Sequence, residues 1–184
     1  MICLGGWEGN IQHRSSEISQ PLKFDVASFL SLILPGTKWC GDGNRAKHDD
    51  ELGSLLKTDR CCRKHDFCFD SILPRQTKYN LTNNGPFVRL HCDCDIEFHR
   101  CLKRANTFAS VGVGIIFFNI LQSRCFKEEY PIVRCIQLTG RTCEQYELDK
   151  SKKKIHQWFA NPKFPISTET LFRETDAIKI GVGR

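Results

Sequence analysis

Several features that mark other protein classes are missing from this chain of 184 residues. No apolar run approaches the roughly 20 residues that a membrane-spanning helix needs. No GxSxG motif indicates a serine nucleophile on a sharp turn. The net charge of +6 comes from dispersed basic residues, without the basic stripe interleaved with aromatic residues that is typical of nucleic-acid binding. A spanning helix, an elbow-type serine hydrolase and a nucleic-acid partner are therefore not predicted.

The first 30 residues also lack the layout of a signal peptide. Their short apolar run, at 29–34, is interrupted by Ser31, follows the acidic Asp25 and leads to no small-residue cleavage site. We expect residues 1–32 to be a leader, a pro-segment or disordered, and residues 33–161 to form one domain. Residues 162–184 are then a tail, and we expect it to be poorly anchored from Pro165 onward, where the composition is polar and mixed.

Cysteine, in contrast, is abundant: the chain has eleven, and ten of them lie between Cys40 and Cys143. Because cytosolic thiols stay reduced, this number predicts a secreted, disulfide-bonded protein. The odd count leaves one cysteine over, and Cys3 is the candidate because it is isolated in the leader. The sequon Asn80-Leu81-Thr82 lies in a polar loop and fits a secreted glycoprotein.

The segment at residues 58–73, TDRCCRKHDFCFDSIL, predicts a helix that carries reactive side chains. Thr58 or Asp59 can cap its N-terminus, since a short side-chain oxygen accepts a hydrogen bond from an otherwise unpaired amide. At about 3.6 residues per turn, one face presents three side chains in line: Cys61, His65 and Cys68. The carboxylate of Asp66 lies about 100° round the helix from His65.

A second helix is predicted at residues 92–105, CDCDIEFHRCLKRA, where two cysteines are again seven residues apart. The two helices can be joined by two disulfides, Cys61–Cys101 and Cys68–Cys94. In both pairs the residue numbers add to the same total, as expected for antiparallel helices in register. Asp95 then lies within one residue of the level of His65. The spacing therefore predicts a general base, His65, oriented by the carboxylate of Asp95.

The loop at residues 35–44, PGTKWCGDGN, comes before the first helix. Its alternating Gly41 and Gly43 can turn backbone carbonyls inward toward a hard cation such as Ca²⁺, which prefers oxygen ligands. A GxG pattern alone favours an ordinary turn. The available carboxylate of Asp66, and a loop cysteine that could bond Cys62, favour the cation site.

The remainder of the chain carries weaker patterns. Residues 107–121 are apolar enough for a third, buried helix, although two glycines weaken it and a strand is possible. Cys135 and Cys143 flank a Thr-Gly turn, which predicts a disulfide-closed hairpin. The lysines at 150–154 either attract the chain to an anionic membrane surface or solvate one face. The aromatic pair at 158–159 is expected to pack back onto the domain.

Together these segments resemble the group III secreted phospholipases A2, the bee-venom type. The resemblance is carried by PGTKWCGDGN, TDRCCRKHDFC, CDCD, the Phe118-Asn119 pair before Cys125, and DKSKKKIHQWF, and it spans about residues 33 to 160. It implies a mainly α, disulfide-rich fold, in which two antiparallel disulfide-stapled helices accompany a calcium loop and a small β-hairpin.

The resemblance also implies specific bonds and ligands. The disulfides would be Cys40–Cys62, Cys61–Cys101, Cys68–Cys94, Cys92–Cys125 and Cys135–Cys143. The ligands of Ca²⁺ would be the backbone carbonyls of Trp39, Gly41 and Gly43 and the carboxylate of Asp66. His65 would be the base and Asp95 its orienting acid. The family commonly has a tyrosine near position 117 whose hydroxyl bonds that acid, but here the residue is Phe117. Part of the hydrogen-bond support of Asp95 is thereby unaccounted for.

The predicted function is calcium-dependent hydrolysis of the sn-2 ester of glycerophospholipids by a secreted, monomeric enzyme at a membrane surface. His65 would take a proton from water, while Ca²⁺ and a loop amide such as that of Gly41 stabilise the oxyanion. Four alternatives remain open at this point. His65 could be a satisfied core histidine, or the CxC pattern and His99 could bind zinc. The scaffold could instead serve a non-catalytic toxin-like or receptor-binding protein, or a purely structural cysteine-rich module.

Overall fold

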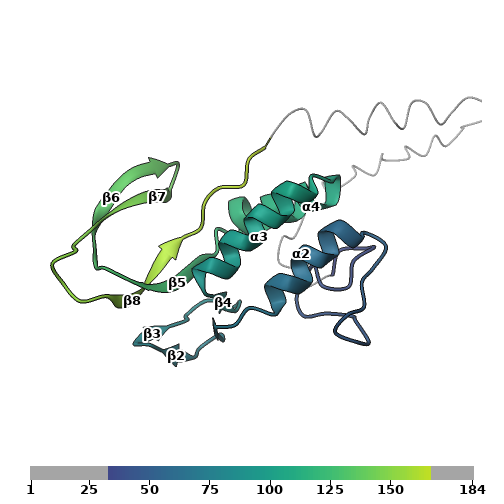
Figure 1. Ribbon diagram of the computed structural model, residues 1–184, viewed down its shortest axis with the longest axis horizontal. Helices are drawn as coiled ribbons and strands as arrows, with labels where there is room; N and C mark the ends of the chain where they lie inside the picture. Colours follow the sequence, from purple (N-terminus) through teal and green to yellow (C-terminus); the bar gives the residue numbers. More distant parts are fainter. Residues whose placement is uncertain (1–32, 167–184) are drawn as a thin grey trace, which may run out of the picture.

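The computed structural model describes residues 33–166 of the chain (Figure 1). Helices occupy its first and middle parts: α2 (Leu56–Asp66), α3 (Cys92–Ala105), α4 (Phe108–Gly114) and the π-helix η1 (Ile115–Ile120). Short strands pair antiparallel in twos: β1 (Ser71–Ile72) with β4 (Arg89–Leu90), β2 (Thr77–Lys78) with β3 (Leu81–Thr82), β5 (Arg124–Glu129) with β8 (Ile155–Ala160), and β6 (Ile132–Thr139) with β7 (Thr142–Leu148). The predicted leader with Cys3, and most of the predicted tail, lie outside the described residues.

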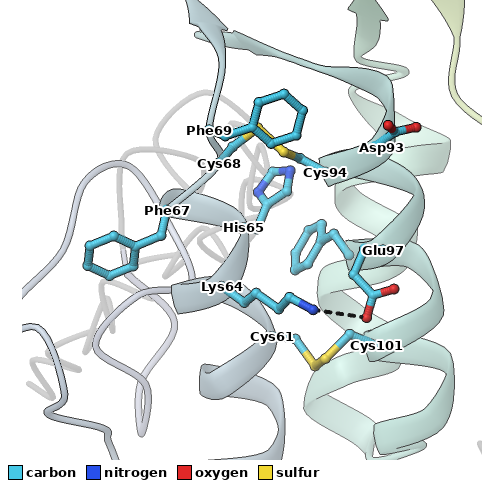
Figure 2. A pocket seen from close by; sticks show the side chains of 11 residues that line it. Cys61, Lys64, His65, Phe67, Cys68, Phe69, Asp93, Cys94, Glu97 and Cys101 are labelled. Atoms are coloured by element: carbon cyan, nitrogen blue, oxygen red, sulfur yellow. Dashed lines mark hydrogen bonds and ion pairs between the residues drawn. A yellow bond between two sulfur atoms is a disulfide. The ribbon is translucent and has the colours of Figure 1, made fainter.

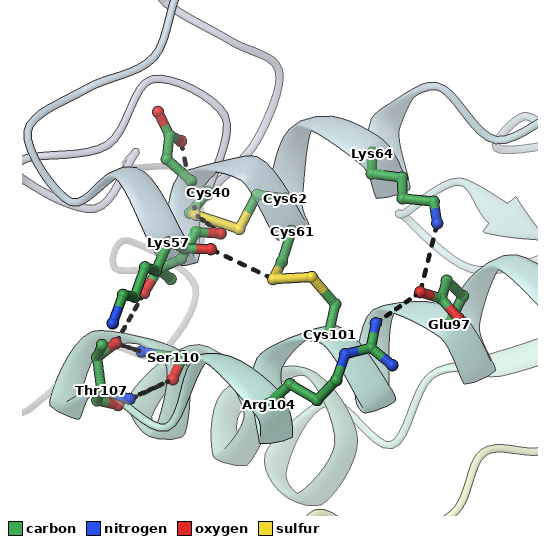
Figure 3. The surroundings of a disulfide bond; sticks show 12 residues. Cys40, Lys57, Cys61, Cys62, Lys64, Glu97, Cys101, Arg104, Thr107 and Ser110 are labelled. Carbon is green, nitrogen blue, oxygen red and sulfur yellow. Dashed lines mark hydrogen bonds and ion pairs between the residues drawn. A yellow bond between two sulfur atoms is a disulfide. The ribbon is translucent and has the colours of Figure 1, made fainter.

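Helices α2 and α3 lie side by side (Figure 1) and are joined by the two disulfides that the pairing assumed from the sequence requires. Cys61 bonds Cys101 near the end of α3, whereas Cys68, just beyond α2, bonds Cys94 at the start of α3. The two helices therefore run antiparallel. All five expected disulfides are present, the other three being Cys40–Cys62, Cys92–Cys125 and Cys135–Cys143. Figure 3 shows that the adjacent Cys61 and Cys62 reach different partners.

The predicted N-cap of the first helix is wrong. The helix begins earlier, at Leu56, without a side-chain cap, and both Thr58 and Asp59 are buried in its first turn. Their oxygens make tertiary contacts instead: the Thr58 hydroxyl lies 2.9 Å from that of Thr107, and Asp59 accepts hydrogen bonds from loop amides. The helix also ends at Asp66, well before the end of the segment at residues 58–73. The later part of that segment forms β1.

The apolar segment at residues 107–121 is helical, which was one of the two structures predicted for it. Thr107 and Ser110 form a capping box at the start of α4, with reciprocal side-chain and backbone hydrogen bonds. The helix then widens into η1, a geometry that is rare and found mostly at functional sites. Gly114 is required by close packing, because a Cβ there would lie 2.6 Å from the ring of Phe164.

The expected mainly α class describes the helical half of the fold only. The predicted hairpin is present as β6 and β7, closed by Cys135–Cys143. Three further strand pairs also occur within residues 33–166. These three pairs give no clear pattern in the sequence. Two of them have strands of only two residues, and the third joins segments far apart in the chain. The result is a disulfide-rich fold of helices and small antiparallel strand pairs.

The core lies between the helices and the loop that precedes them. Its buried members include Trp39, Phe98, Leu102, Phe118 and Phe164. A smaller cluster forms around the Cys92–Cys125 disulfide and Phe159, so the predicted packing of the aromatic pair at 158–159 is confirmed for Phe159. Asn80 is exposed at the turn between β2 and β3. Over residues 33–166, the helices are too short and too polar for any of them to cross a bilayer.

Candidate active site

The structure brings His65 and Asp95 into direct contact. His65 lies near the end of α2 and Asp95 in the first turn of α3, and the disulfides on either side of them fix the two helices in register. His65 Nε2 is 2.7 Å from Asp95 Oδ1. The Asp95 side chain is 1 % exposed and that of His65 is 10 % exposed. When Asp95 is ionised, Nε2 carries the proton that is shared with it, which leaves Nδ1 as the acceptor nitrogen.

Aromatic side chains hold the imidazole of His65 in place. Its ring stacks on Phe98 at a centroid distance of 4.1 Å and meets the edge of Phe117 at 5.1 Å. Phe117 belongs to η1, so the π-helix supplies one wall of the histidine site. Because the ring is held on two sides, its Nδ1 has few orientations, as general-base chemistry requires.

The second oxygen of Asp95 is also hydrogen-bonded. The side-chain amide of Asn161, just after β8, donates to Asp95 Oδ2. Asn161 was not among the predicted site residues. It lies 66 residues from Asp95 in the sequence, in a segment without a periodic pattern, so only the fold could reveal it.

The glycine-bearing loop is held against α2 by Asp59. Its carboxylate is fully buried and accepts hydrogen bonds from three backbone amides, those of Lys38 (2.9 Å), Trp39 (2.8 Å) and Gly53 (2.7 Å). The Cys40–Cys62 disulfide adds a covalent link to the same helix (Figure 3). The loop that carries the predicted calcium ligands is therefore fixed next to the helix that carries Asp66.

In the part of the chain that the structure describes, the carboxylate of Asp66 has no hydrogen-bond or ion-pair partner. Its side chain keeps exposed surface, yet burial of the carboxylate raises the pKa of Asp66 to about 7, against the lowering effect of His65 and with a further raising effect from Asp59. A carboxylate that is costly to ionise suits a bound cation.

The predicted donor set fits Ca²⁺ in its chemistry. The predicted ligands, the carbonyls of Trp39, Gly41 and Gly43 and the carboxylate of Asp66, are all hard oxygen donors of the kind that Ca²⁺ selects. Gly43 has a φ of 71°, a left-handed conformation that glycine adopts without strain. No cluster of three or more His, Cys, Asp or Glu side chains suited to a metal occurs in the described part of the chain, so any calcium site there depends on backbone carbonyls.

A pocket of about 310 Å³ opens beside His65, between α2 and α3 (Figure 2). Its walls are mostly apolar and include Phe67, Phe69 and Phe98, together with the two helix-joining disulfides. The Lys64–Glu97 ion pair lies along one wall (Figure 2). An apolar pocket beside a histidine suits a substrate with a hydrocarbon chain.

The zinc alternative, which involved the CxC pattern and His99, fails. All ten cysteines between Cys40 and Cys143 are in disulfides, so none supplies a thiolate. His99 is half-buried between the rings of Phe118 and Phe164, and burial lowers its pKa. Its Nε2 lies 3.1 Å from the carbonyl of Lys163. His99 therefore helps to pack the end of the described chain onto α3.

Fold and site together are those of a small, disulfide-bonded hydrolase with an apolar substrate pocket. Comparison with known proteins specifies the family. Residues 33–129 match the family described as Phospholipase A2. A phospholipase A2 from Apis dorsata is 46 % identical over 134 residues, which are 72 % of this chain and all of that protein. Those from Apis mellifera and Xylocopa aruana are 44 % and 43 % identical, over 72 % and 73 % of this chain and 80 % and 76 % of theirs. The chain belongs to the phospholipase A2 family, and its bee relatives agree with the predicted group III type.

Proposed function

We propose that this protein is a secreted, calcium-dependent phospholipase A2 that hydrolyses the sn-2 ester of glycerophospholipids at a membrane surface. The observation that carries the proposal is the 2.7 Å contact between His65 and Asp95 beside an apolar pocket. Family membership supports lipid hydrolysis, and the ten paired cysteines suit the oxidising compartments through which secreted proteins pass.

In this mechanism water is the nucleophile and His65 is the general base. The N–H at Nε2 of His65 keeps its hydrogen bond to Asp95. This bond fixes the tautomer and stabilises the imidazolium that forms when Nδ1 accepts a proton from water. The activated water attacks the sn-2 carbonyl, and His65 then returns the proton to the leaving alkoxide. The rings of Phe98 and Phe117 restrict the imidazole throughout. No covalent enzyme intermediate is formed.

Calcium would be held by the carbonyls of Trp39, Gly41 and Gly43 and by Asp66. When bound, the ion supplies positive charge for the substrate phosphate and for the developing oxyanion. Asp59 and the Cys40–Cys62 bond hold the carbonyl-bearing loop against α2. The loop amide of Gly41 donates to the carbonyl of Trp39 at 3.2 Å in this structure, so it would have to turn from that carbonyl to donate to the same oxyanion.

Exposed apolar side chains around the pocket support action at a membrane surface. Phe67 and Phe69 line the pocket and are 54 % and 74 % exposed, and Leu73, close by in the chain, is 52 % exposed. Such a patch next to an opening is suited to contact with lipid. The lysines at 150–154 are exposed, but two of them pair with carboxylates, Lys152 with Asp149 and Lys154 with Glu129. We therefore assign membrane contact to the exposed apolar residues Phe67, Phe69 and Leu73 rather than to the lysines.

The test uses purified protein and vesicles of a phosphatidylcholine that carries different acyl chains at its two positions. Mass spectrometry identifies the released fatty acid and the lysophospholipid. We expect release of the sn-2 chain alone, loss of release in EGTA, and recovery when Ca²⁺ is added in excess. Release in EGTA would refute the calcium role, and release of the sn-1 chain would refute the positional assignment.

The variant His65→Gln tests the base. It should lose about 10² to 10⁴ in kcat, because general-base catalysis contributes on that order, while the thermal midpoint stays near that of the parent. Hydrolysis at the parental rate would exclude His65 as the base. A non-catalytic binding protein on the same scaffold is the second candidate, and it is favoured only if a biological effect of the protein survives this substitution unchanged.

A further inference from the structure

Asn161 is buried and forms hydrogen bonds with residues that are far from it in the sequence. Its side chain is 3 % exposed and its amide nitrogen donates two hydrogen bonds, one to Asp95 Oδ2 and one to the backbone carbonyl of Ser123 at 3.0 Å. Its own carbonyl oxygen is buried and has no hydrogen-bond partner within residues 33–166. An unpaired buried carbonyl is unfavourable, so the two donated bonds must outweigh that cost.

The orientation of this amide follows from its surroundings. Turning it by 180° would place the side-chain oxygen against a carboxylate oxygen and a backbone carbonyl, which are both acceptors. Only the nitrogen can satisfy both contacts. Asn161 is therefore a donor to Asp95, on the oxygen that His65 does not use.

The segment that carries Asn161 is held in place independently of this contact. Asn119 of η1 bonds both the amide and the carbonyl of Phe164, at 2.8 and 2.9 Å. His99 contacts the carbonyl of Lys163. Since β8 ends at Ala160 just before Asn161 and these bonds hold Lys163 and Phe164 just after it, the backbone at Asn161 is fixed without its bond to Asp95.

We propose that Asn161 is a positioning residue for the reaction, which acts by holding the carboxylate of Asp95 in the plane that meets His65. It supplies a hydrogen bond to the oxygen of Asp95 that His65 does not contact. Phe117 cannot donate one, and packs its ring edge on His65 instead. With both oxygens bonded, Asp95 cannot rotate away from the imidazole, so His65 keeps the tautomer with Nδ1 free. This inference rests on the roles proposed above for His65 and Asp95.

The test compares Asn161→Leu, which removes both donors at similar volume, with the parent protein. A short-chain phosphatidylcholine below its micellar concentration separates kcat from KM without effects of surface binding. We expect kcat to fall about tenfold, on the order of one lost charged hydrogen bond, with KM within about twofold of the parental value. In an Asp95→Asn background the same substitution should have almost no further effect on kcat, because the residue through which it acts is already changed.

Asn119→Leu is the matched control. It removes a second asparagine that holds the same chain segment, through Phe164, but does not touch Asp95. It should lower the thermal midpoint and leave kcat near the parental value. Equal loss of kcat in both variants would mean that Asn161 merely anchors the segment, and would overturn the inference.

Two other outcomes also overturn it: an unchanged kcat in Asn161→Leu, or a full tenfold loss that persists in the Asp95→Asn background. If Asn161→Leu does not fold, Asn161→Ser replaces it, since serine is too short to reach Asp95 and is readily accommodated. The proposed function is tested separately, by the His65→Gln variant. Hydrolysis that survives His65→Gln refutes that function, whereas an inactive His65→Gln with a fully active Asn161→Leu refutes only the role of Asn161.

Discussion

Substitution of Asp59 should lower both the stability of the protein and the affinity of the proposed calcium site. The Asp59 carboxylate is fully buried, and it is the only side chain within residues 33–166 that accepts hydrogen bonds from the three amides of Lys38, Trp39 and Gly53. Asp59→Asn keeps the shape but turns one oxygen into a donor, which faces a donor amide. Asp59→Ala removes all the acceptors and leaves the three amides unpaired.

The expected size follows from these contacts. A hydrogen bond to a charged group contributes about 1.5–3 kcal/mol, and a buried donor left unpaired costs about 1–3 kcal/mol. We expect Asp59→Asn to lower the free energy of unfolding by about 2 kcal/mol and Asp59→Ala by about 4 kcal/mol, because some loop amides will reach water. For a domain of this size, 2 kcal/mol is a fall of roughly 6–10 °C in Tm.

Thermal unfolding by circular dichroism and calcium titration by calorimetry, on the same samples, provide the measurement. Both variants should bind Ca²⁺ more weakly in the order of their loss of stability, since the loop carbonyls lose their support. Glu147→Gln, which removes an exposed acid paired with Arg134 on the distant hairpin, is the control and should change neither quantity. An Asp59→Asn protein with parental Tm and parental calcium affinity would refute the reasoning.

Three further predictions concern charge, packing and crosslinking. Because burial raises the pKa of Asp66 to about 7, the proton must leave before a cation binds. The apparent Kd for Ca²⁺ should rise about tenfold per pH unit below 7 and level off above it, and a flat profile from pH 5.5 to 8.5 by calorimetry would contradict this. Gly114→Ala should cost about 1–3 kcal/mol in chemical unfolding, since its Cβ would meet Phe164 at 2.6 Å, whereas Gly112→Ala, with open space, should not destabilise. The paired change of Cys135 and Cys143 to serine should lower stability by about 2 kcal/mol and leave kcat unchanged, and a lost kcat would link the hairpin to the site.

The sequence alone predicts the part of the site that depends on helix periodicity. Two cysteines seven residues apart on each helix, together with an assumed pairing of Cys61 with Cys101 and Cys68 with Cys94, place Asp95 within one residue of the level of His65. The structure has this pairing and brings the two side chains into contact. The five disulfides follow in the same way or from the resemblance. The calcium ligands and the catalytic roles stay predictions, because they depend on an ion and a substrate.

Other parts of the structure could not be read from the sequence, for physical reasons. The cap rule assigns Asp59 to the end of a helix, but its oxygens are used by amides some 20 residues earlier in the chain, a contact of tertiary origin. The change from α4 to the π-helix η1 leaves no periodic trace in an apolar run. Asn161 reaches Asp95 only because the last strand and the Phe164 contacts place it there.

The neighbouring positions of Cys61 and Cys62 have a consequence for how the molecule is oxidised. Each must select its own distant thiol, Cys101 for the first and Cys40 for the second. An isomer with these two partners exchanged would keep the same mass and the same number of crosslinks. It would, however, rotate the helix by about 100° relative to its neighbours and aim the imidazole of His65 away from the acid. Any refolded isomer with these partners exchanged should therefore be chromatographically separable from the native protein and should not hydrolyse lipid.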